Sequence, residues 1–154
     1  MRCSSSSHNA PPLRTVPSPS NDVRTVVAYY FSKILSADFD EAVERTTEAL
    51  KREGFGIITE IDIQQTLKKK INVEFRPYRI LGACNPALAL EALKLEDKVG
   101  TMLPCNVIVQ AASPGQVEVA AIDPVASMKA IENPALLEKA RAIRAKLEKA
   151  INSL

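Results

Sequence analysis

The sequence predicts a single α+β domain in which helices pack on one face of a mostly antiparallel sheet. Three observations lead to this fold class. The expected elements run strand, helix, strand, short helix, strand and helix, followed by two consecutive strands and further helix. The turn sequence Ser113-Pro-Gly-Gln116 separates those two strands and is typical of a hairpin. Hydrophobic residues make up 46% of the 154 residues, without any Trp, which suits one aliphatic core.

The first strand and helix are expected before residue 55. Residues 25–31 are rich in β-branched and aromatic side chains, which favours a strand. Asp38 and Glu41 have the spacing of a capping box and predict the start of a helix, which Gly54 ends.

The next segment changes its hydrophobic period within a few residues. Apolar and polar side chains alternate over residues 57–64, which predicts a half-buried strand with Glu60 and Asp62 on its solvated face. Apolar residues then recur every four positions from 63 to 71, which indicates a short helix. Lysines 68–70 are expected on its outer surface.

A strand and a buried helix follow. Residues 78–83 form a compact apolar run, which predicts a strand. Asn85 as N-cap and Pro86 at the first helical position then predict a helix that ends near Asp97.

The last elements are the hairpin strands, 106–112 and 117–122, a helical turn at 125–131 and a long helix. Asn133-Pro134 marks the start of that helix. Its apolar residues, from Leu136 to Leu154, are spaced alternately four and three apart. Such a stripe packs on the sheet or contributes to a dimer interface.

The apolar surface exceeds what one layer of helices can cover, and we therefore expect a homodimer. The surface predicted to be buried between chains is either the sheet around Val107–Val109 or the stripe Leu136–Leu154.

Charge and composition exclude several functional classes. Residues 22–154 carry 18 basic and 18 acidic side chains, so the domain is neutral and has no general affinity for nucleic acid. We also expect no membrane partner, because no stretch approaches the ~20 apolar residues of a membrane helix.

Residues 1–21 are expected to be a disordered tail outside the domain of residues 22–154. The tail is rich in Ser and Pro and contains no acidic residue. An organelle-targeting segment is the alternative, but the tail shows no amphipathic helix. The chain's three cysteines cannot all pair, which favours a reducing, cytoplasmic location.

The chain contains three linked motifs: Phe75-Arg-Pro-Tyr-Arg-Ile-Leu-Gly-Ala-Cys-Asn-Pro86, Leu103-Pro-Cys-Asn-Val107 and Ala121-Ile-Asp-Pro124. With these motifs, the region from about Val23 to Leu154 resembles the family known as domain of unknown function 302. The resemblance implies a compact α+β fold and a homodimer. It implies no activity, because none is established for the family as a whole.

Two cysteines in similar settings, Cys84 and Cys105, form a candidate thiol site. Each is followed by Asn and lies beside a proline at the boundary of an element. Cys84 is expected to be the more reactive, because it precedes a capped helix start that favours a thiolate. Burial of both cysteines as core residues is the alternative.

Five further residues are candidates for ligand binding. The candidates are Arg76, Arg79, Asn85, Asn106 and Asp123. Each also has an ordinary structural explanation, such as a helix cap or a turn. We expect no metal site, because residues 22–154 contain no His and only two Cys.

The sequence therefore predicts a binding module for a small ligand that is anionic or apolar. A thiol-based redox or sulfur-handling protein using Cys84 and Cys105 is the alternative. No catalytic constellation is complete, so an enzyme ranks last, and no cofactor is expected.

Overall fold

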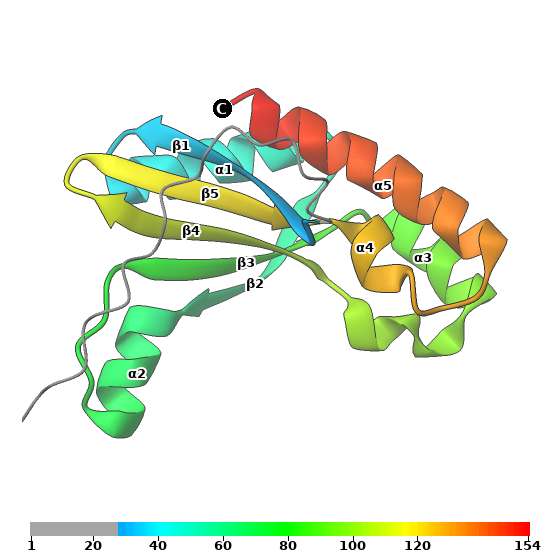
Figure 1. The fold of residues 1–154 in the computed structure, drawn as a ribbon, viewed down its shortest axis with the longest axis horizontal. Coiled ribbons are helices and arrows are strands. Elements are labelled where there is room, and N and C mark those ends of the chain that lie inside the picture. Colours follow the sequence, from blue (N-terminus) through cyan, green and yellow to red (C-terminus); the bar gives the residue numbers. More distant parts are fainter. Residues whose placement is uncertain (1–27) are drawn as a thin grey trace, which may run out of the picture.

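The computed structural model describes residues 28–154, and within them five strands form one antiparallel sheet (Figure 1). The strands lie in the order β1-β5-β4-β3-β2. Their bounds are Tyr30–Ser36 for β1, Gly56–Asp62 for β2, Tyr78–Cys84 for β3, Cys105–Ser113 for β4 and Gln116–Ile122 for β5. The α+β class and the β4–β5 hairpin are confirmed. The tail predicted at residues 1–21 lies outside the described residues.

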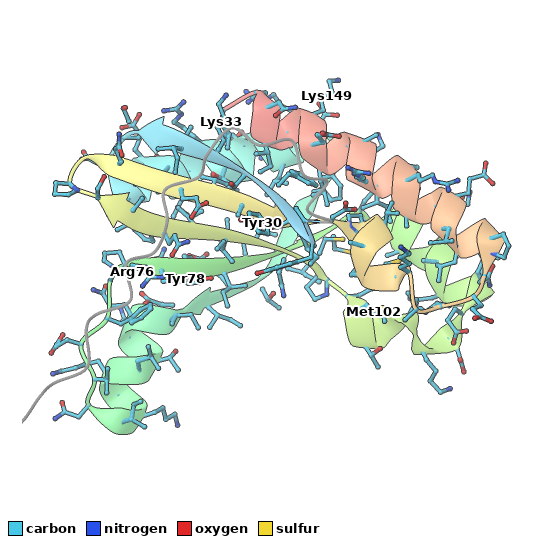
Figure 2. All side chains as sticks on the ribbon, in the orientation of Figure 1. Tyr30, Lys33, Arg76, Tyr78, Met102 and Lys149 are labelled. Atoms are coloured by element: carbon cyan, nitrogen blue, oxygen red, sulfur yellow. The ribbon has the colours of Figure 1, made fainter. Side chains whose placement is uncertain are left out.

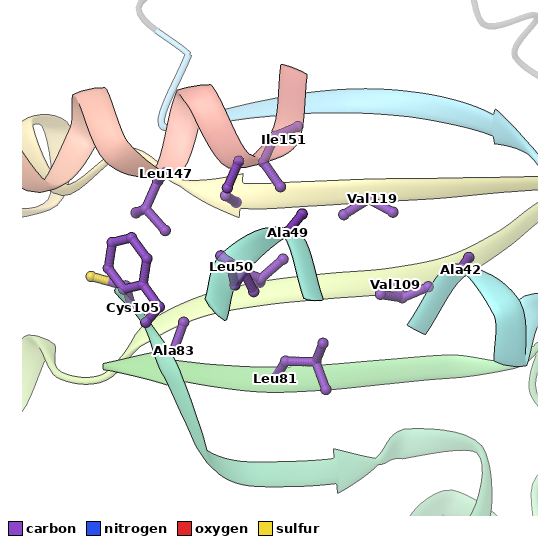
Figure 3. Close-up of a cluster of buried hydrophobic side chains, with 14 of the residues drawn as sticks. Ala42, Ala49, Leu50, Leu81, Ala83, Cys105, Val109, Val119, Leu147 and Ile151 are labelled. Atoms are coloured by element: carbon purple, nitrogen blue, oxygen red, sulfur yellow. The ribbon is translucent and has the colours of Figure 1, made fainter. Parts of the chain in front are cut away.

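Two long helices, α1 (Phe39–Arg52) and α5 (Pro134–Asn152), cover one face of the sheet (Figure 1). Aliphatic side chains from both helices and from the central strands fill the space between the layers. Figure 3 shows Leu50 of α1 and Leu147 of α5 with Leu81 and Val109 of the sheet in this core. Burial of such side chains is the main source of stability in a domain of this size.

A second, smaller core lies beyond the end of the sheet. It joins α5 to α3 (Pro86–Leu95), to the 3₁₀ helix η1 (Asp97–Met102) and to α4 (Pro124–Met128). Val99 and Met128 are buried there against Leu136 of α5. Because α5 contributes to both cores, it connects the two ends of the domain.

Two of the predicted helix starts have the expected caps. The Asn85 side chain accepts a hydrogen bond from the Leu88 N–H, and the Asn133 side chain accepts one from the Leu136 N–H. At α1 the capping-box prediction is wrong, because the Asp38 side chain makes no cap hydrogen bond. Acidic residues in the first turn of α1 still favour the helix through its dipole.

The first strand lies further along the chain than predicted. β1 spans Tyr30–Ser36, and residues 25–27 of the predicted strand are outside the described residues. β1 is held by antiparallel pairing with β5, from Tyr30 opposite Ile122 to Ser36 opposite Gln116. This pairing extends the strand beyond Phe31, where the predicted strand ended.

Because of a β-bulge, the side chains of β2 do not lie on the faces that the sequence predicted. The register shifts between Ile57 and Thr59, so the alternation reverses at that point. Glu60 and Asp62 consequently lie on the helix side of the sheet, where both contact Arg79, and not on the open side.

The surfaces predicted to carry a dimer are buried within one chain. Val107 and Val109 are fully buried, as are Leu136 and Leu147. The two helices and the smaller core cover these four side chains, so they are not available for a dimer interface. Ile108, between the two valines, lies on the other face of the sheet and is half-buried.

Candidate functional site

Among residues 28–154, no helix packs across the centre of the sheet face opposite α1 and α5, here called the open face (Figure 1). Register aligns its side chains into rows across the strands. Ala120, Ile108 and Ile80 form an apolar row, because Ile108 pairs with both of the others. Glu118, Gln110 and Tyr78 form the next row, which is polar and aromatic.

A hollow of about 380 Å³ lies on this face. That volume is at the small end of the range for ligand pockets. Its floor is apolar and its walls carry tyrosines and polar groups. The lining residues are Tyr29, Tyr30, Arg76, Tyr78, Asn106, Ile108, Gln110, Glu118, Ala120, Ala121 and Ile122.

A polar network of three side chains runs across one end of the hollow. Nε and Nη2 of Arg76 both donate to Oε1 of Gln110, at 3.0 and 2.7 Å. Nε2 of Gln110 donates to Oε2 of Glu118 at 2.7 Å. The Gln110 amide is thus aligned between a cation and a carboxylate. The Arg76 guanidinium also lies 4.4 Å from the centroid of the Phe75 ring and 5.6 Å from that of Tyr78.

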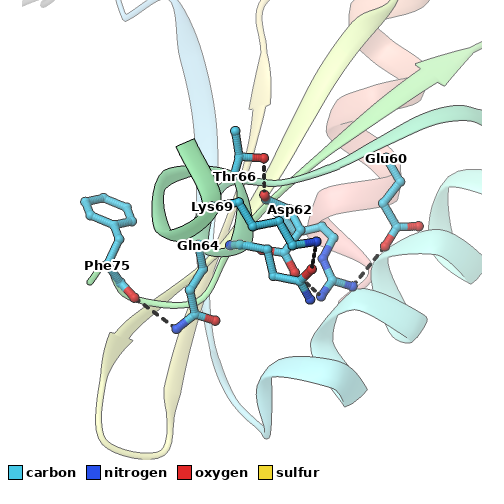
Figure 4. Close-up of polar contacts among 8 residues, drawn as sticks. Glu60, Asp62, Gln64, Thr66, Lys69 and Phe75 are labelled. Carbon is cyan, nitrogen blue, oxygen red and sulfur yellow. Dashed lines mark hydrogen bonds and ion pairs between the residues drawn. The ribbon is translucent and has the colours of Figure 1, made fainter. Parts of the chain in front are cut away.

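The segment that carries Arg76 is tied to its surroundings. Helix α2 (Ile63–Ile71) has no buried residue, yet its Gln64 side chain donates to the Phe75 carbonyl at 2.9 Å (Figure 4). On the other side of Arg76, the Pro77 carbonyl accepts a hydrogen bond from the Ala111 N–H at 3.0 Å. These two bonds position Arg76 beside Tyr78 at the start of β3 (Figure 2).

Of the five predicted ligand-binding residues, the structure brings only Arg76 and Asn106 to the hollow. Arg79 lies on the other face of β3 because strand side chains alternate. Its guanidinium pairs with Glu60 at 2.9 Å and Asp62 at 3.5 Å, and lies over the Phe39 ring of α1.

The other two predicted residues have structural contacts. Asn85 caps α3. The buried carboxylate of Asp123 caps α4 by accepting from the Val125 N–H at 2.9 Å, and it faces Nε of Arg144 at 3.4 Å. These contacts match the structural explanations that the sequence offered for both residues.

The two cysteines lie at the same end of the sheet. Cys105 pairs with Ala83, the residue before Cys84, and both cysteines line a cavity of about 20 Å³ near the start of α3. Both thiols are free. Cys84 is half-buried, whereas Cys105 is buried. Burial, with a smaller contribution from Cys84, raises the pKa of the Cys105 thiol to about 11.

Sequence reasoning missed most residues of the hollow, including Tyr30, Tyr78, Gln110 and Glu118. One sequence signal for these residues was available in strands β4 and β5. Gln110 and Glu118 interrupt otherwise apolar runs, and each is polar at a position facing away from the core. Their convergence depends on strand register, which no local pattern encodes.

Within residues 28–154, no three His, Cys, Asp or Glu side chains gather closely enough to form a candidate metal site. None of the helices in the described part of the chain is long and apolar enough to span a membrane.

The fold and the hollow define a small α+β domain with a two-layer body and one open sheet face. The chain belongs to the family Domain of unknown function DUF302, whose model matches residues 31–154. It is similar to the crystal structure of an uncharacterised conserved DUF302 protein from Bacillus stearothermophilus, with 29% sequence identity and a TM-score of 0.75. The match covers 80% of this chain and 96% of that one. No curated protein matches the chain.

Proposed function

We propose that this protein is a binding module for a small ligand and that the ligand occupies the hollow on the open face. The observation that carries the proposal is the hollow itself, which combines an apolar floor with a positioned polar network. Binding sites for small molecules have this composition, since apolar walls supply affinity and a few polar groups fix orientation. No role in the core requires the Arg76–Gln110–Glu118 network, because its three members lie outside both buried clusters.

A test is to titrate the protein with a panel of neutral and charged bicyclic aromatic fragments, followed by amide NMR. Binding at the hollow shifts the resonances of Tyr30, Ile108 and Gln110 more than those of α1 and α5. Ala120→Trp fills the floor and should abolish these shifts, whereas Ala87→Trp on the exposed side of α3 should not. Ile108→Arg is a second blocking variant if the first one fails to fold. Shifts that survive both blocking variants would contradict the proposal.

The second candidate is sulfur handling by Cys84 and Cys105. The observation in its favour is the cavity of about 20 Å³ that both residues line, because this volume suits one added atom such as a persulfide sulfur. In the proposed step, the Cys84 thiolate takes the outer sulfur of a low-molecular-weight persulfide, RSSH. One S–S bond breaks and one forms, giving Cys84–SSH and the thiolate RS⁻.

Mass spectrometry of the native protein after treatment with glutathione persulfide tests this candidate. One sulfur atom should be added to Cys84, while Cys105 stays unmodified because it is buried and its pKa is raised. Cys84→Ser should lose the added sulfur and Cys105→Ala should retain it. If neither thiol reacts until the protein is unfolded, both cysteines are core residues and only the ligand-binding proposal remains.

The homodimer stays a prediction, although most side chains of the surfaces first assigned to it are buried within one chain. The larger exposed apolar side chains include Ile34 on the open face and Leu90 and Leu93 on α3. Light scattering of the full chain at micromolar concentration tests the prediction, and a monomer would contradict it. The cytoplasmic location remains an inference from cysteine usage.

A further inference from the structure

We infer that the ligand of the open-face hollow is a small carboxylate with a flat apolar body, and that Arg76 binds its carboxylate group. This inference rests on the proposed function and adds the chemical class of the ligand. It follows from the unused edge of one guanidinium, the shape of the floor beside it and the placement of the one acidic side chain of the hollow.

The Arg76 guanidinium is positioned but not neutralised by the residues that the structure describes. Its hydrogen bonds, through Nε and Nη2, both go to the neutral amide of Gln110. Within residues 28–154 no carboxylate pairs with Arg76, whereas Arg79, three residues on, has two carboxylate partners. Nη1 and the second N–H of Nη2 make no hydrogen bond to a described residue. These two groups form the end of the fork that binds a carboxylate in a bidentate manner.

Arg76 is exposed, but contacts within the chain already restrict the orientation of its guanidinium. Two hydrogen bonds to Gln110 and the ring faces of Phe75 and Tyr78 hold it in one plane. A group that is already ordered loses little conformational entropy on binding, so a larger part of the interaction energy contributes to affinity.

The floor beside the network suits a flat apolar body. Ala120 and Ile108 are opposite each other on neighbouring strands, and the small Ala side chain leaves space over the sheet. Tyr30 on β1 and Tyr78 on β3 border this space on the open face, with β5 and β4 between them. Planar rings pack well between aromatic and aliphatic side chains. The hydroxyl groups of a saturated, heavily hydroxylated ligand would find no hydrogen-bond partner on this apolar floor.

Glu118 restricts the position of the carboxylate. It is the acidic residue of the hollow, and Gln110 separates it from Arg76. Because like charges repel, the ligand carboxylate is directed to the Arg76 side of Gln110 and its apolar body toward Ala120.

The experiment compares two probes of equal shape, 2-naphthoate and its neutral amide 2-naphthamide, by NMR titration of the full chain. A hydrogen bond to a charged group is about twice as strong as one to a neutral group, and Arg76 is exposed. Naphthoate should therefore bind about 5- to 10-fold more tightly than the amide. Arg76→Gln should remove that difference by lowering the naphthoate affinity to about that of the amide. Arg76→Lys, which keeps the charge but loses the fork, should give an intermediate affinity for naphthoate.

Two matched controls separate local recognition from net charge. Arg45→Gln makes the same change on α1, where Arg45 is exposed and pairs with Glu41, so both affinities should stay unchanged. Glu118→Gln should tighten naphthoate binding by about 2- to 5-fold, because a repelling charge is removed.

Each alternative result has a distinct meaning. If both probes bind the hollow of the unmodified protein with equal affinity, or Arg76→Gln leaves the naphthoate affinity unchanged, the ligand is not a carboxylate. The proposal that the hollow binds a small ligand would be unaffected. If neither probe shifts resonances of the hollow, the inference and the proposed function both fail. Naphthoate shifts confined to α1 or α5 would also overturn both.

Discussion

The two faces of the central strands differ in what their residues do, although the residues alternate along the same chain. On β3, Leu81 is fully buried under the helices, whereas its neighbour Ile80 on the open face is half-buried. On β4, Val109 faces the core and Gln110 joins the polar network. The covered face is aliphatic and contributes most of the stability, while the open face combines aromatic and polar groups that the core does not need. Stability and the candidate site are therefore separable by mutation.

The largest effect is expected from the pair Leu81→Ala and Ile80→Ala, which delete the same number of carbon atoms from neighbouring residues. Leu81→Ala should lower the free energy of unfolding by about 2–5 kcal/mol, since it leaves a cavity in the main core. Ile80→Ala should lower it by about 1 kcal/mol or less, because the side chain is partly in water already. Urea unfolding measures both values. Equal losses would show that another molecule or segment buries the open face.

The second effect is a loss of stability at high pH that comes from Cys105 on the covered face. The Cys105 pKa is raised from 9.0 to about 11, so between these values the unfolded chain loses a proton that the folded chain keeps. The free energy of unfolding is therefore unaffected by this group below pH 9. It falls by about 2–3 kcal/mol in total as the pH rises toward 11.

Comparison of unfolding curves at pH 8.5 and pH 10.5 measures this loss, with Cys105→Ala as the variant that should be less sensitive to pH. Cys84→Ala, which removes the half-buried thiol and leaves Cys105 in place, should keep most of the pH dependence. An unmodified protein and a Cys105→Ala variant with the same pH profile would contradict the assignment.

The third and smallest effect is expected at Gly82, which packs closely against Thr59 and Pro104 at one end of the open face. A Cβ atom at Gly82 would lie 2.0 Å from Oγ1 of Thr59 and 2.7 Å from Cγ of Pro104. Gly82→Ala should therefore destabilise the protein by about 1–2 kcal/mol through overpacking.

The control for this prediction is Gly56→Ala, whose added Cβ would have its nearest neighbour at 4.0 Å and should be nearly neutral. Thr59→Ala combined with Gly82→Ala should recover part of the loss, because one of the two clashing atoms is removed. A neutral Gly82→Ala would mean that Thr59 and Pro104 move aside without cost, which would contradict the prediction.

The sequence by itself determined the order of the elements and most of their boundaries after residue 36. Asn85-Pro86 and Asn133-Pro134 start helices where predicted, and the hairpin turn lies between β4 and β5. These signals are local, since a cap or a turn depends on residues within one or two turns of chain. The candidate residues Arg76 and Asn106 were also identified from sequence, together with three that have structural roles elsewhere.

Only the tertiary structure decided which side chains meet. The bulge in β2 turned Glu60 and Asp62 toward Arg79, and the register of β3, β4 and β5 aligned Tyr78, Gln110 and Glu118 beside Arg76. A one-residue change of register moves every side chain of a strand to the other face, so such contacts depend on pairing between distant segments. The dimer surfaces were misplaced for the same reason, because the burial of Val107 and Leu147 is decided by helices that come from other parts of the chain.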